Sequence, residues 1–238
     1  MHLTPTQVAN HLACNHLTQL ERQRREGLLK IDFSPDPRLD AMRERGLQHE
    51  QAYIEALRRE GRSICDLRQE HDPAATRRAM EAGFDAIVQA PLRNDLFSGI
   101  ADVLLRVDSP NSSLPGYAYE PADAKLSLET KAGTILQLCT YAELLASMQG
   151  VAPEHIHVAT PLGLETYRTA QFHAYYRLAR SRLHAAVSAT PAPDTYPHPV
   201  AHCDTCVYWR HCDQQRRAGA HPSLIAGFPT AQVLAFPQ

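Results

Sequence analysis

Apolar residues recur along this chain at two spacings, which predict helices in some stretches and strands in others. Between residues 39 and 60 they repeat every three or four positions, which predicts a long helix with His49 and Glu50 inside it. Residues 131–149 and about 170–187 show the same period. We therefore expect three long helices.

Between the first and second of these helices, short runs rich in branched and aromatic side chains replace the helical pattern. Residues 84–92, 96–107 and 116–126 form three such runs, and turn-forming residues separate them. The pattern predicts three successive antiparallel strands, and "HIHVAT" at 155–160 predicts a further short strand. This order of helices and strands predicts an α/β core in which helices flank a mixed sheet.

Both ends of the chain differ from this predicted core. Thr4 as the N-cap, Pro5 at the first helical position and Gln7 three residues after the cap predict a helix that begins with a capping box. Cys14 is expected near the end of the third turn of this helix. The region from residue 191 onward is dense in proline, histidine and cysteine, so we expect an irregular segment that a metal holds together.

The predicted elements divide the chain into three consecutive parts. Residues 1–70 are expected to form an N-terminal helical region, residues 80–190 the α/β core, and residues 191–238 a cysteine-rich tail. With 238 residues and 44% hydrophobic content, the chain is large enough to bury a real core. We expect a globular protein with one large domain, or with a domain and a small accessory piece.

Charge and apolar runs restrict the partners and the compartment. The 24 basic and 26 acidic residues give a net charge of −2, which neither establishes nor excludes nucleic-acid binding through a local basic groove. No run reaches the ~18 apolar residues of a membrane span and the N-terminus lacks a signal-peptide pattern, so we expect no membrane association and a cytoplasmic location. There, the six cysteines are expected to be metal ligands, redox groups or buried apolar residues instead of disulfides.

Lys125 is one of only three lysines among the 24 basic residues. It follows Asp123 by two positions in a predicted strand, so both side chains project from the same face. Antiparallel pairing can bring Asp102 of the preceding strand opposite them. Two carboxylates offer the oxygen ligands that magnesium or manganese prefers, and the ammonium can stabilise charge that develops on a phosphate. Glu120 points to the other face by alternation and is left outside this candidate site.

These motifs together resemble the RecB-like branch of the PD-(D/E)XK nuclease superfamily. "GIADVLLRV", "DAK" at 123–125 and "QLCTY" at 137–141 resemble that branch's glycine-and-aspartate strand, its D/E-x-K strand and its Q-x-x-x-Y helix. "GLQHE" at 46–50 is similar to its helical histidine motif. The resemblance implies a restriction-endonuclease-like core and a metal-dependent enzyme that hydrolyses phosphodiester bonds in DNA.

The resemblance also implies roles for individual residues. The ligands that it implies for magnesium or manganese are His49, Asp102, Asp123 and the backbone carbonyl of Ala124. The catalytic residues that it implies are Lys125, Asp102, Asp123, Gln137 and Tyr141. Gln137 and Tyr141 would share one face of a flanking helix, because they lie one turn apart. Arginine would replace Lys125 poorly, because its guanidinium group is wider and more firmly protonated.

Three cysteines lie close together near the C-terminus. Cys203, Cys206 and Cys212 supply three thiolates, one fewer than a closed tetrahedral site requires. A structural zinc site is one possibility that this spacing leaves open. Either His202 or His211 could then provide the fourth ligand.

The fourth ligand can also come from a distant cysteine. Cys65 and Cys139 are expected to be buried small residues, which leaves Cys14. One N-terminal cysteine combined with a C-terminal C-x2-C-x5-C motif resembles the iron-sulfur clasp of a subset of RecB-like nucleases, including CRISPR-associated exonucleases. That resemblance implies a structural 4Fe-4S cluster, bound by Cys14 and the three C-terminal cysteines, which ties the two ends of the chain across the nuclease core.

The segments around these motifs resemble more closely the N-terminal nuclease module of large bacterial RecB-like proteins, in which a helicase follows in the same chain. This chain contains no P-loop, so a helicase domain or subunit is expected as a partner, and we expect an excised or stand-alone version of such a module. The implied function is a single-strand-preferring DNA exonuclease in DNA repair, recombination or defence. Two alternatives stay open: a non-catalytic nucleic-acid- or partner-binding module with a structural iron-sulfur or zinc site, and a zinc-stapled scaffold with a fortuitous D-x-K motif.

Overall fold

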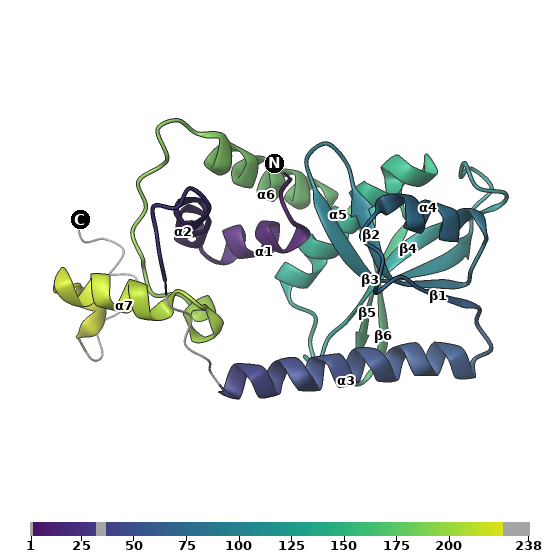
Figure 1. The fold of residues 1–238 in the computed structure, drawn as a ribbon, viewed down its shortest axis with the longest axis horizontal. Helices are drawn as coiled ribbons and strands as arrows, with labels where there is room; N and C mark the ends of the chain where they lie inside the picture. Colours follow the sequence, from purple (N-terminus) through teal and green to yellow (C-terminus); the bar gives the residue numbers. More distant parts are fainter. Residues whose placement is uncertain (1, 32–36, 226–238) are drawn as a thin grey trace. The chain divides into compact units, whose positions relative to one another are not determined.

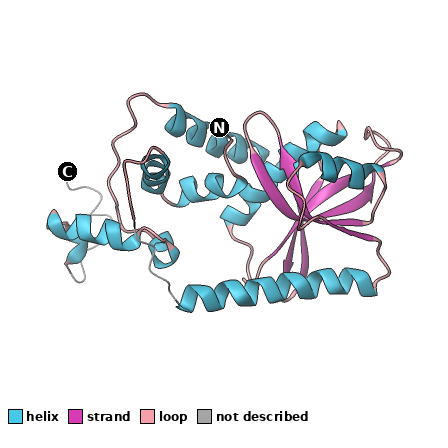
Figure 2. Cartoon of the chain, viewed as in Figure 1, coloured by secondary structure: helices cyan, strands magenta, loops and turns pink. Residues whose placement is uncertain are grey.

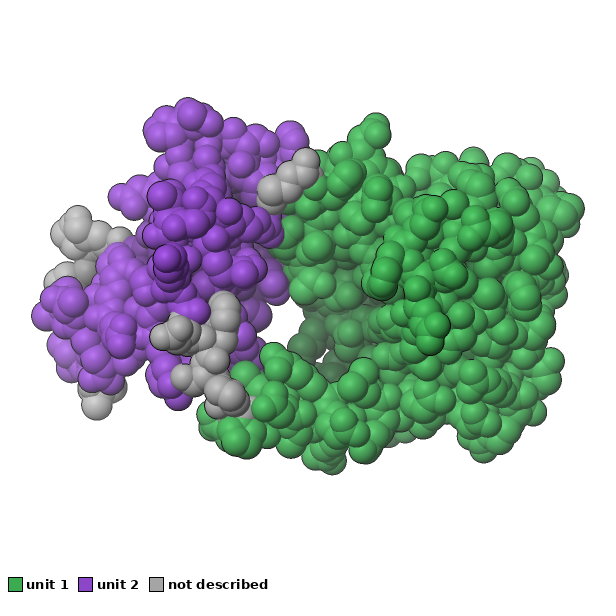
Figure 3. Space-filling view, in the orientation of Figure 1, with its two compact units in different colours: residues 1–9, 37–180 green, residues 10–36, 181–238 purple. Residues whose placement is uncertain are grey.

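The computed structural model describes residues 2–31 and 37–225. The chain divides into two compact units, and each unit is assembled from separate stretches of the sequence (Figure 3). Unit 1 comprises Met1–Ala9 and Pro37–Arg180, and unit 2 comprises Asn10–Asp36 and Ser181–Gln238. The division expected from the sequence runs instead in three consecutive parts.

Unit 1 combines one sheet with several helices (Figures 1 and 2). Its six strands are β1 (Ile64–Asp66), β2 (Ala86–Arg93), β3 (Ser98–Asp108), β4 (Tyr117–Ala124), β5 (His155–Thr160) and β6 (Gly163–Arg168). Its helices are α3 (Pro37–Arg59), α4 (Pro73–Glu81) and α5 (Ala132–Gln149), with the first part of α1 (Pro5–Ala13) and most of α6 (Thr169–Ser188). Within the part of the chain that the structure describes, no helix has the length and apolar character needed to cross a membrane.

The pairing of the strands confirms the predicted mixed sheet, whose strand order follows the sequence from β1 to β6. β2, β3 and β4 form the expected antiparallel meander, and β5 pairs antiparallel with β6. β1 is parallel to β2, and β4 is parallel to β5. Parallel neighbours need a crossover connection, which α4 provides for the first pair and α5 for the second.

Helices cover both faces of this sheet (Figure 1). On one face, Ile54 and Leu57 of α3 pack against Val88 of β2, Val103 of β3 and Ala122 of β4, and all five side chains are buried. Helices α4 and α5 lie on the opposite face. Strand β2 is buried along nearly its whole length. Because successive strand residues point to opposite faces, this strand carries apolar side chains on both faces of the sheet.

The elements that the sequence analysis missed are the short or exposed ones. β1 spans three residues, too few to show an alternating pattern. β6 has mainly exposed or half-buried side chains, so it lacks an apolar face. Helix α4 has a recognisable start, because the Asp72 side chain accepts a hydrogen bond from the amide of Ala74 at 3.0 Å and Pro73 occupies the first helical position.

The N-terminal helix begins as predicted and ends earlier than predicted. The amide of Thr4 donates a hydrogen bond to Oε1 of Gln7 at 2.8 Å, which is one half of the expected capping box. α1 ends at Ala13, and Cys14 is the N-cap residue of a second helix, α2 (Asn15–Arg25). The prediction that Cys14 lies in the third turn was wrong, because its extended backbone, with φ −159° and ψ 108°, separates the two helices.

Unit 2 is mainly helical and contains segments from both ends of the chain. It comprises the end of α1, α2, the end of α6, η1 (Ala201–Thr205), α7 (Trp209–Ala218) and η2 (Pro222–Leu224). Leu17 and Leu20 of α2 pack with Tyr208 and Cys212 in a buried cluster, and the Tyr208 hydroxyl donates to Oε1 of Glu21 at 2.8 Å. The C-terminal segment expected to be irregular therefore contains a regular helix, α7, and residues 226–238 of that segment lie outside the described residues.

Gly99 lets the start of α1 pack against β3. A Cβ atom at Gly99 would lie 2.7 Å from Cδ and 2.9 Å from Cγ of Pro5, and 3.2 Å from Cε1 of Tyr141. The proline ring is rigid, so Gly99→Ala must displace it. We expect this variant to lower the free energy of unfolding by about 1–3 kcal/mol in denaturant titrations.

Gly46 in α3 provides the control for Gly99→Ala. Nothing lies within 4 Å of a Cβ atom added at Gly46. Alanine is a better helix former than glycine, so Gly46→Ala should raise the stability by roughly 0.5–1 kcal/mol. A Gly99→Ala variant as stable as the wild type would contradict the close contact with Pro5.

Candidate active site and cysteine pocket

The two predicted carboxylates meet at the end of the β3–β4 ladder. Val103 of β3 pairs with Ala122 of β4 at the last position of this ladder. Asp102 and Asp123 follow one step further in the same register, so their side chains project from the same face. The charge of Asp123 acts on the Asp102 carboxyl, as expected for neighbouring groups. The register is consistent with the predicted placement of these two residues.

Lys125 contacts this pair, as the two-residue spacing predicted. Its Nζ atom donates a hydrogen bond to Oδ1 of Asp123 at 2.7 Å. The Asp123 side chain is 3% exposed, whereas the Lys125 side chain is 36% exposed. The ammonium group therefore lies between the buried carboxylate and the solvent, where a substrate can reach it.

Glu120 belongs to a different network on β4. Its Oε2 atom lies 2.8 Å from Nε2 of His157, and its Oε1 atom accepts a hydrogen bond from the His155 amide at 2.8 Å. Burial alone would raise the pKa of Glu120, but these hydrogen bonds and the charges of both histidines outweigh burial and hold the pKa below its ordinary value. Leaving Glu120 out of the candidate site is consistent with these contacts.

The surroundings of Asp102 favour its protonated form. Burial is the main cause that raises the pKa of Asp102 well above its ordinary value, and the hydrogen bond and charge of Asp123 raise it further. The charge of Lys125 opposes this shift, and the charge of Glu50 adds to it. A carboxyl beside a second carboxylate ionises less readily than an isolated one. A divalent cation would offset this penalty.

Asp102 should destabilise the cation-free protein at alkaline pH. Its pKa in the folded protein lies above the ordinary value of 3.8, so the folded state retains a proton that the unfolded chain has lost, and stability falls as pH rises between the two values. Asp102→Asn removes this penalty. We expect chelator-treated Asp102→Asn to melt a few degrees above the wild type at pH ~8, and this difference to shrink toward pH ~4. Equal differences at both pH values would contradict a raised pKa of Asp102 as the cause.

One oxygen of the pair is not satisfied by the protein. Oδ2 of Asp123 is buried and has no hydrogen-bond partner among the described residues. Such an atom is costly to leave unpaired, and a cation would satisfy it. In residues 2–31 and 37–225, no three His, Cys, Asp or Glu side chains are grouped so that they could hold a metal ion. Magnesium and manganese suit the pair nonetheless, because one or two carboxylates commonly hold such ions while water and phosphate oxygens complete the shell.

His49 reaches the neighbouring strand end from α3. Its Nε2 atom lies 2.9 Å from the carbonyl oxygen of Ala159 on β5, which also accepts the amide of Lys125 at 2.9 Å. Ala124 pairs with Ala159 in the β4–β5 ladder. Both predicted accessory ligands therefore lie next to Lys125. His49 would have to exchange its contact with Ala159 before Nε2 could bind a cation.

Helix α5 carries the two remaining predicted site residues. Tyr141 is buried, and its hydroxyl donates a hydrogen bond to the carbonyl of Ile100 on β3. Burial and the charge of Asp102 raise the pKa of the Tyr141 hydroxyl, while a hydrogen bond with Gln137 lowers it. The hydroxyl thus stays protonated close to Asp102 and fixes α5 against the strand that carries this acid.

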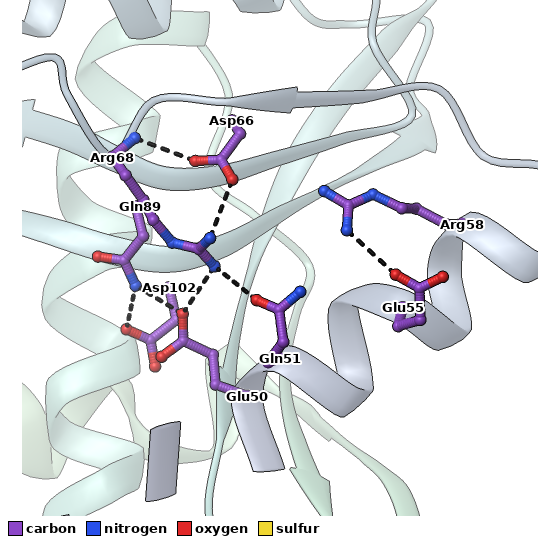
Figure 4. A network of polar contacts seen from close by, with 8 residues as sticks. All are labelled: Glu50, Gln51, Glu55, Arg58, Asp66, Arg68, Gln89 and Asp102. Carbon is purple, nitrogen blue, oxygen red and sulfur yellow. Dashed lines mark hydrogen bonds and ion pairs between the residues drawn. The ribbon is translucent and has the colours of Figure 1, made fainter. Parts of the chain in front are cut away.

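Two further residues lie at the pair and were not predicted as site residues. Nε2 of Gln89 on β2 donates to Oε1 of Glu50 at 2.9 Å and to Oδ1 of Asp102 at 3.5 Å (Figure 4). Glu50 follows His49 in the sequence, but nothing in the local pattern indicates that it faces Asp102. For Gln89, the signal was a polar residue within an otherwise apolar strand.

The four cysteines expected to bind a cluster line one pocket in unit 2. Its lining residues include three histidines and four cysteines, which are His16, His198, His202, Cys14, Cys203, Cys206 and Cys212. None of these four cysteines forms a disulfide. The pKa is raised for three of these thiols, which belong to Cys14, Cys206 and Cys212. Burial is the main cause, and neighbouring cysteines raise the pKa further. A metal centre would have to displace these protons, because only thiolates bind it.

The other two cysteines differ from each other. Cys139 is buried as expected, and burial raises the pKa of its thiol to about 12. Cys65 is only half-buried, so the expectation that it is a buried residue was wrong; it lies on β1, at the edge of the sheet. Of the two histidines considered as zinc ligands, His202 lines the cysteine pocket and His211 is not among its lining residues.

Comparisons with known proteins leave the family of this chain open. No family model matches it, and no curated protein matches it. Among solved structures, the crystal structure of SSO0001 aligns with 16% identity and a TM-score of 0.32, over 83% of this chain and 95% of that chain. A similarity of this size carries no argument about function.

Proposed function

We propose that this chain is a magnesium- or manganese-dependent DNA nuclease with its active site at Asp102, Asp123 and Lys125. The observation that carries the proposal is a pair of carboxylates, the half-buried Asp102 and the buried Asp123, of which Asp123 has one oxygen without a partner among the described residues and is contacted by a lysine that faces solvent. Replacing a buried charged group by packed apolar residues is often neutral or stabilising. A charged group that lowers the stability of the fold in this way is best explained by a role in catalysis.

Each member of the group has a task in the proposed reaction. Asp102 and Asp123 would hold the cation at the end of the β3–β4 ladder. When bound, the cation would lower the pKa of the attacking water and neutralise charge on the scissile phosphate. Lys125 would orient the nucleophile and stabilise charge on the phosphate oxygens from the solvent side.

The neighbouring residues would support this centre. His49 and the carbonyl of Ala124 would be accessory ligands, because both lie at the strand ends beside Lys125. Tyr141 would hold α5 against β3 through its hydrogen bond to Ile100. Gln137, which hydrogen-bonds with Tyr141, would contact the DNA strand from the same helix.

The proposal extends to a 4Fe-4S cluster in unit 2. Such a cluster takes four cysteine thiolates. Four cysteines line one pocket here, which supplies the ligand number and type that such a cluster requires. The cluster would be structural, because Cys14 and the three C-terminal cysteines come from opposite ends of the chain.

The resemblance to RecB-like nucleases extends the proposal to the substrate and the partners. The core would be of the restriction-endonuclease-like type. The substrate would be single-stranded DNA, which the enzyme would degrade as an exonuclease. A helicase domain or subunit would supply this strand, in DNA repair, recombination or defence within the cytoplasm.

Cleavage of labelled DNA tests the proposed function. Protein purified without oxygen is incubated with end-labelled single-stranded and duplex DNA, with manganese, with magnesium or with a chelator. We expect cleavage of the single strand with either ion and no cleavage with the chelator. If neither DNA is cut with manganese, the proposed function is wrong. Equal cleavage of the duplex would remove only the strand preference.

A further inference from the structure

Gln89 belongs to a row of three polar side chains that crosses the centre of the sheet. The β2–β3 register is the same before and after Gln89 and places it opposite Asp102. The β3–β4 register places Asp102 opposite Asp123. Gln89 therefore approaches the carboxylate pair from β2, on the side of Asp102 that is remote from Asp123.

The backbone of Gln89 is unusual for a strand residue. Its φ angle is 52°, in the left-handed region that glycine adopts readily and that residues with a Cβ atom rarely adopt. The ladder pairs its neighbours Val88 and Ala90 with β3 but leaves Gln89 itself unpaired. Such strained positions persist when the surrounding structure holds them, and they concentrate at functional sites.

The side-chain amide of Gln89 bridges two carboxylates (Figure 4). Its Nε2 atom lies 2.9 Å from Oε1 of Glu50 and 3.5 Å from Oδ1 of Asp102. A primary amide carries two N–H donors, so one nitrogen can serve both acceptors. The Glu50 side chain is 14% exposed, and its Oε1 atom lies 3.9 Å from Nη2 of Arg68. Arg68 in turn pairs with Asp66 of β1 at 3.2 Å.

We propose that Gln89 is a positioning residue of the cation site, which orients the Asp102 carboxylate toward Asp123, and that Glu50 holds the Gln89 amide in place. This inference rests on the proposed function. A donor at Oδ1 of Asp102 fixes the rotation of the carboxylate and leaves its other oxygen for the cation. Hydrogen bonds of this kind typically change metal affinity by about 10–100-fold when they are removed.

Manganese binding to the full-length protein, measured by titration calorimetry without DNA, tests this role. Gln89→Gly removes the amide and suits the left-handed backbone, so it should fold at least as well as the wild type. We expect it to bind manganese roughly tenfold more weakly. Glu50→Ala should show a smaller loss in the same direction. Glu55→Gln, which changes the charge of the same helix at a glutamate paired with Arg58 at 3.2 Å, should leave the affinity unchanged.

The outcomes separate the positioning role from the proposed function. Unchanged affinity in Gln89→Gly, together with loss of binding in Asp123→Asn, would overturn the positioning role and leave the cation site standing. An unchanged Glu50→Ala variant would overturn the part assigned to Glu50. Equal losses of affinity in Glu55→Gln and Gln89→Gly would show that the charge of α3 sets the affinity. That result would contradict the positioning role of Gln89. If the wild type binds no manganese, both the proposed function and this inference are wrong.

Discussion

Replacing Lys125 by alanine is expected to reduce manganese-dependent cleavage of single-stranded DNA by roughly 10²–10³-fold. The Lys125 ammonium lies 2.7 Å from Oδ1 of Asp123 and faces solvent, where it can stabilise charge that develops on the phosphate. An interaction of this kind acts mainly in the transition state, so kcat should fall more than KM rises. Asp123→Asn, which keeps the shape and removes the charge, should abolish detectable cleavage because the pair would lose half of its ligand charge.

Lys131→Ala is the matched control for Lys125→Ala. Lys131 is exposed at the start of α5, so its removal changes the net charge equally without touching the carboxylate pair. It should cleave DNA at the wild-type rate. Circular dichroism and iron content should be unchanged in all three variants. Wild-type rates in both Lys125→Ala and Asp123→Asn would place the active site elsewhere.

Cys14→Ala is expected to remove the brown colour and most of the iron from protein purified without oxygen. Cys14 is the one proposed ligand from the N-terminal segment, and the other three are Cys203, Cys206 and Cys212. Linking such distant residues restricts the unfolded chain, by roughly 4–5 kcal/mol for a 100-residue loop on a scale derived from disulfides. Without this link, the segments of unit 2 from both chain ends should become sensitive to limited proteolysis.

Two other cysteines provide controls for the cluster. Cys65 and Cys139 lie in unit 1, so Cys65→Ala and Cys139→Ala should keep the colour and the iron content. His202→Ala separates a cluster from a zinc site, because a fourth ligand at His202 would make this variant lose metal. Zinc in place of iron in the wild type, or full colour in Cys14→Ala, would refute the cluster and leave the nuclease site untouched.

Apolar periodicity predicted the longer elements and missed several of the shorter ones, including α2 and α4. Helices α3, α5 and α6 and strands β2 to β5 follow the predicted ranges closely. Strand β6 has no apolar face, so only its pairing with β5 identifies it. The break at Cys14 could not be predicted, because the residues on both sides are compatible with one continuous helix.

The candidate site was predictable where it depends on local geometry. Strand alternation and antiparallel register are enough to bring Asp102, Asp123 and Lys125 together. The bridge from Gln89 to Glu50 joins residues 39 positions apart and depends on where α3 crosses the sheet. No local pattern contains that information, and the left-handed backbone of Gln89 has no counterpart in its sequence neighbours.

The location of a bound cation tests the central claim most directly. Crystals of the full chain soaked in manganese, with anomalous data collected at the manganese edge, would show where the ion binds. We predict a peak about 2.1 Å from carboxylate oxygens of both Asp102 and Asp123. Manganese bound only at other positions, with none at this pair, would contradict the account.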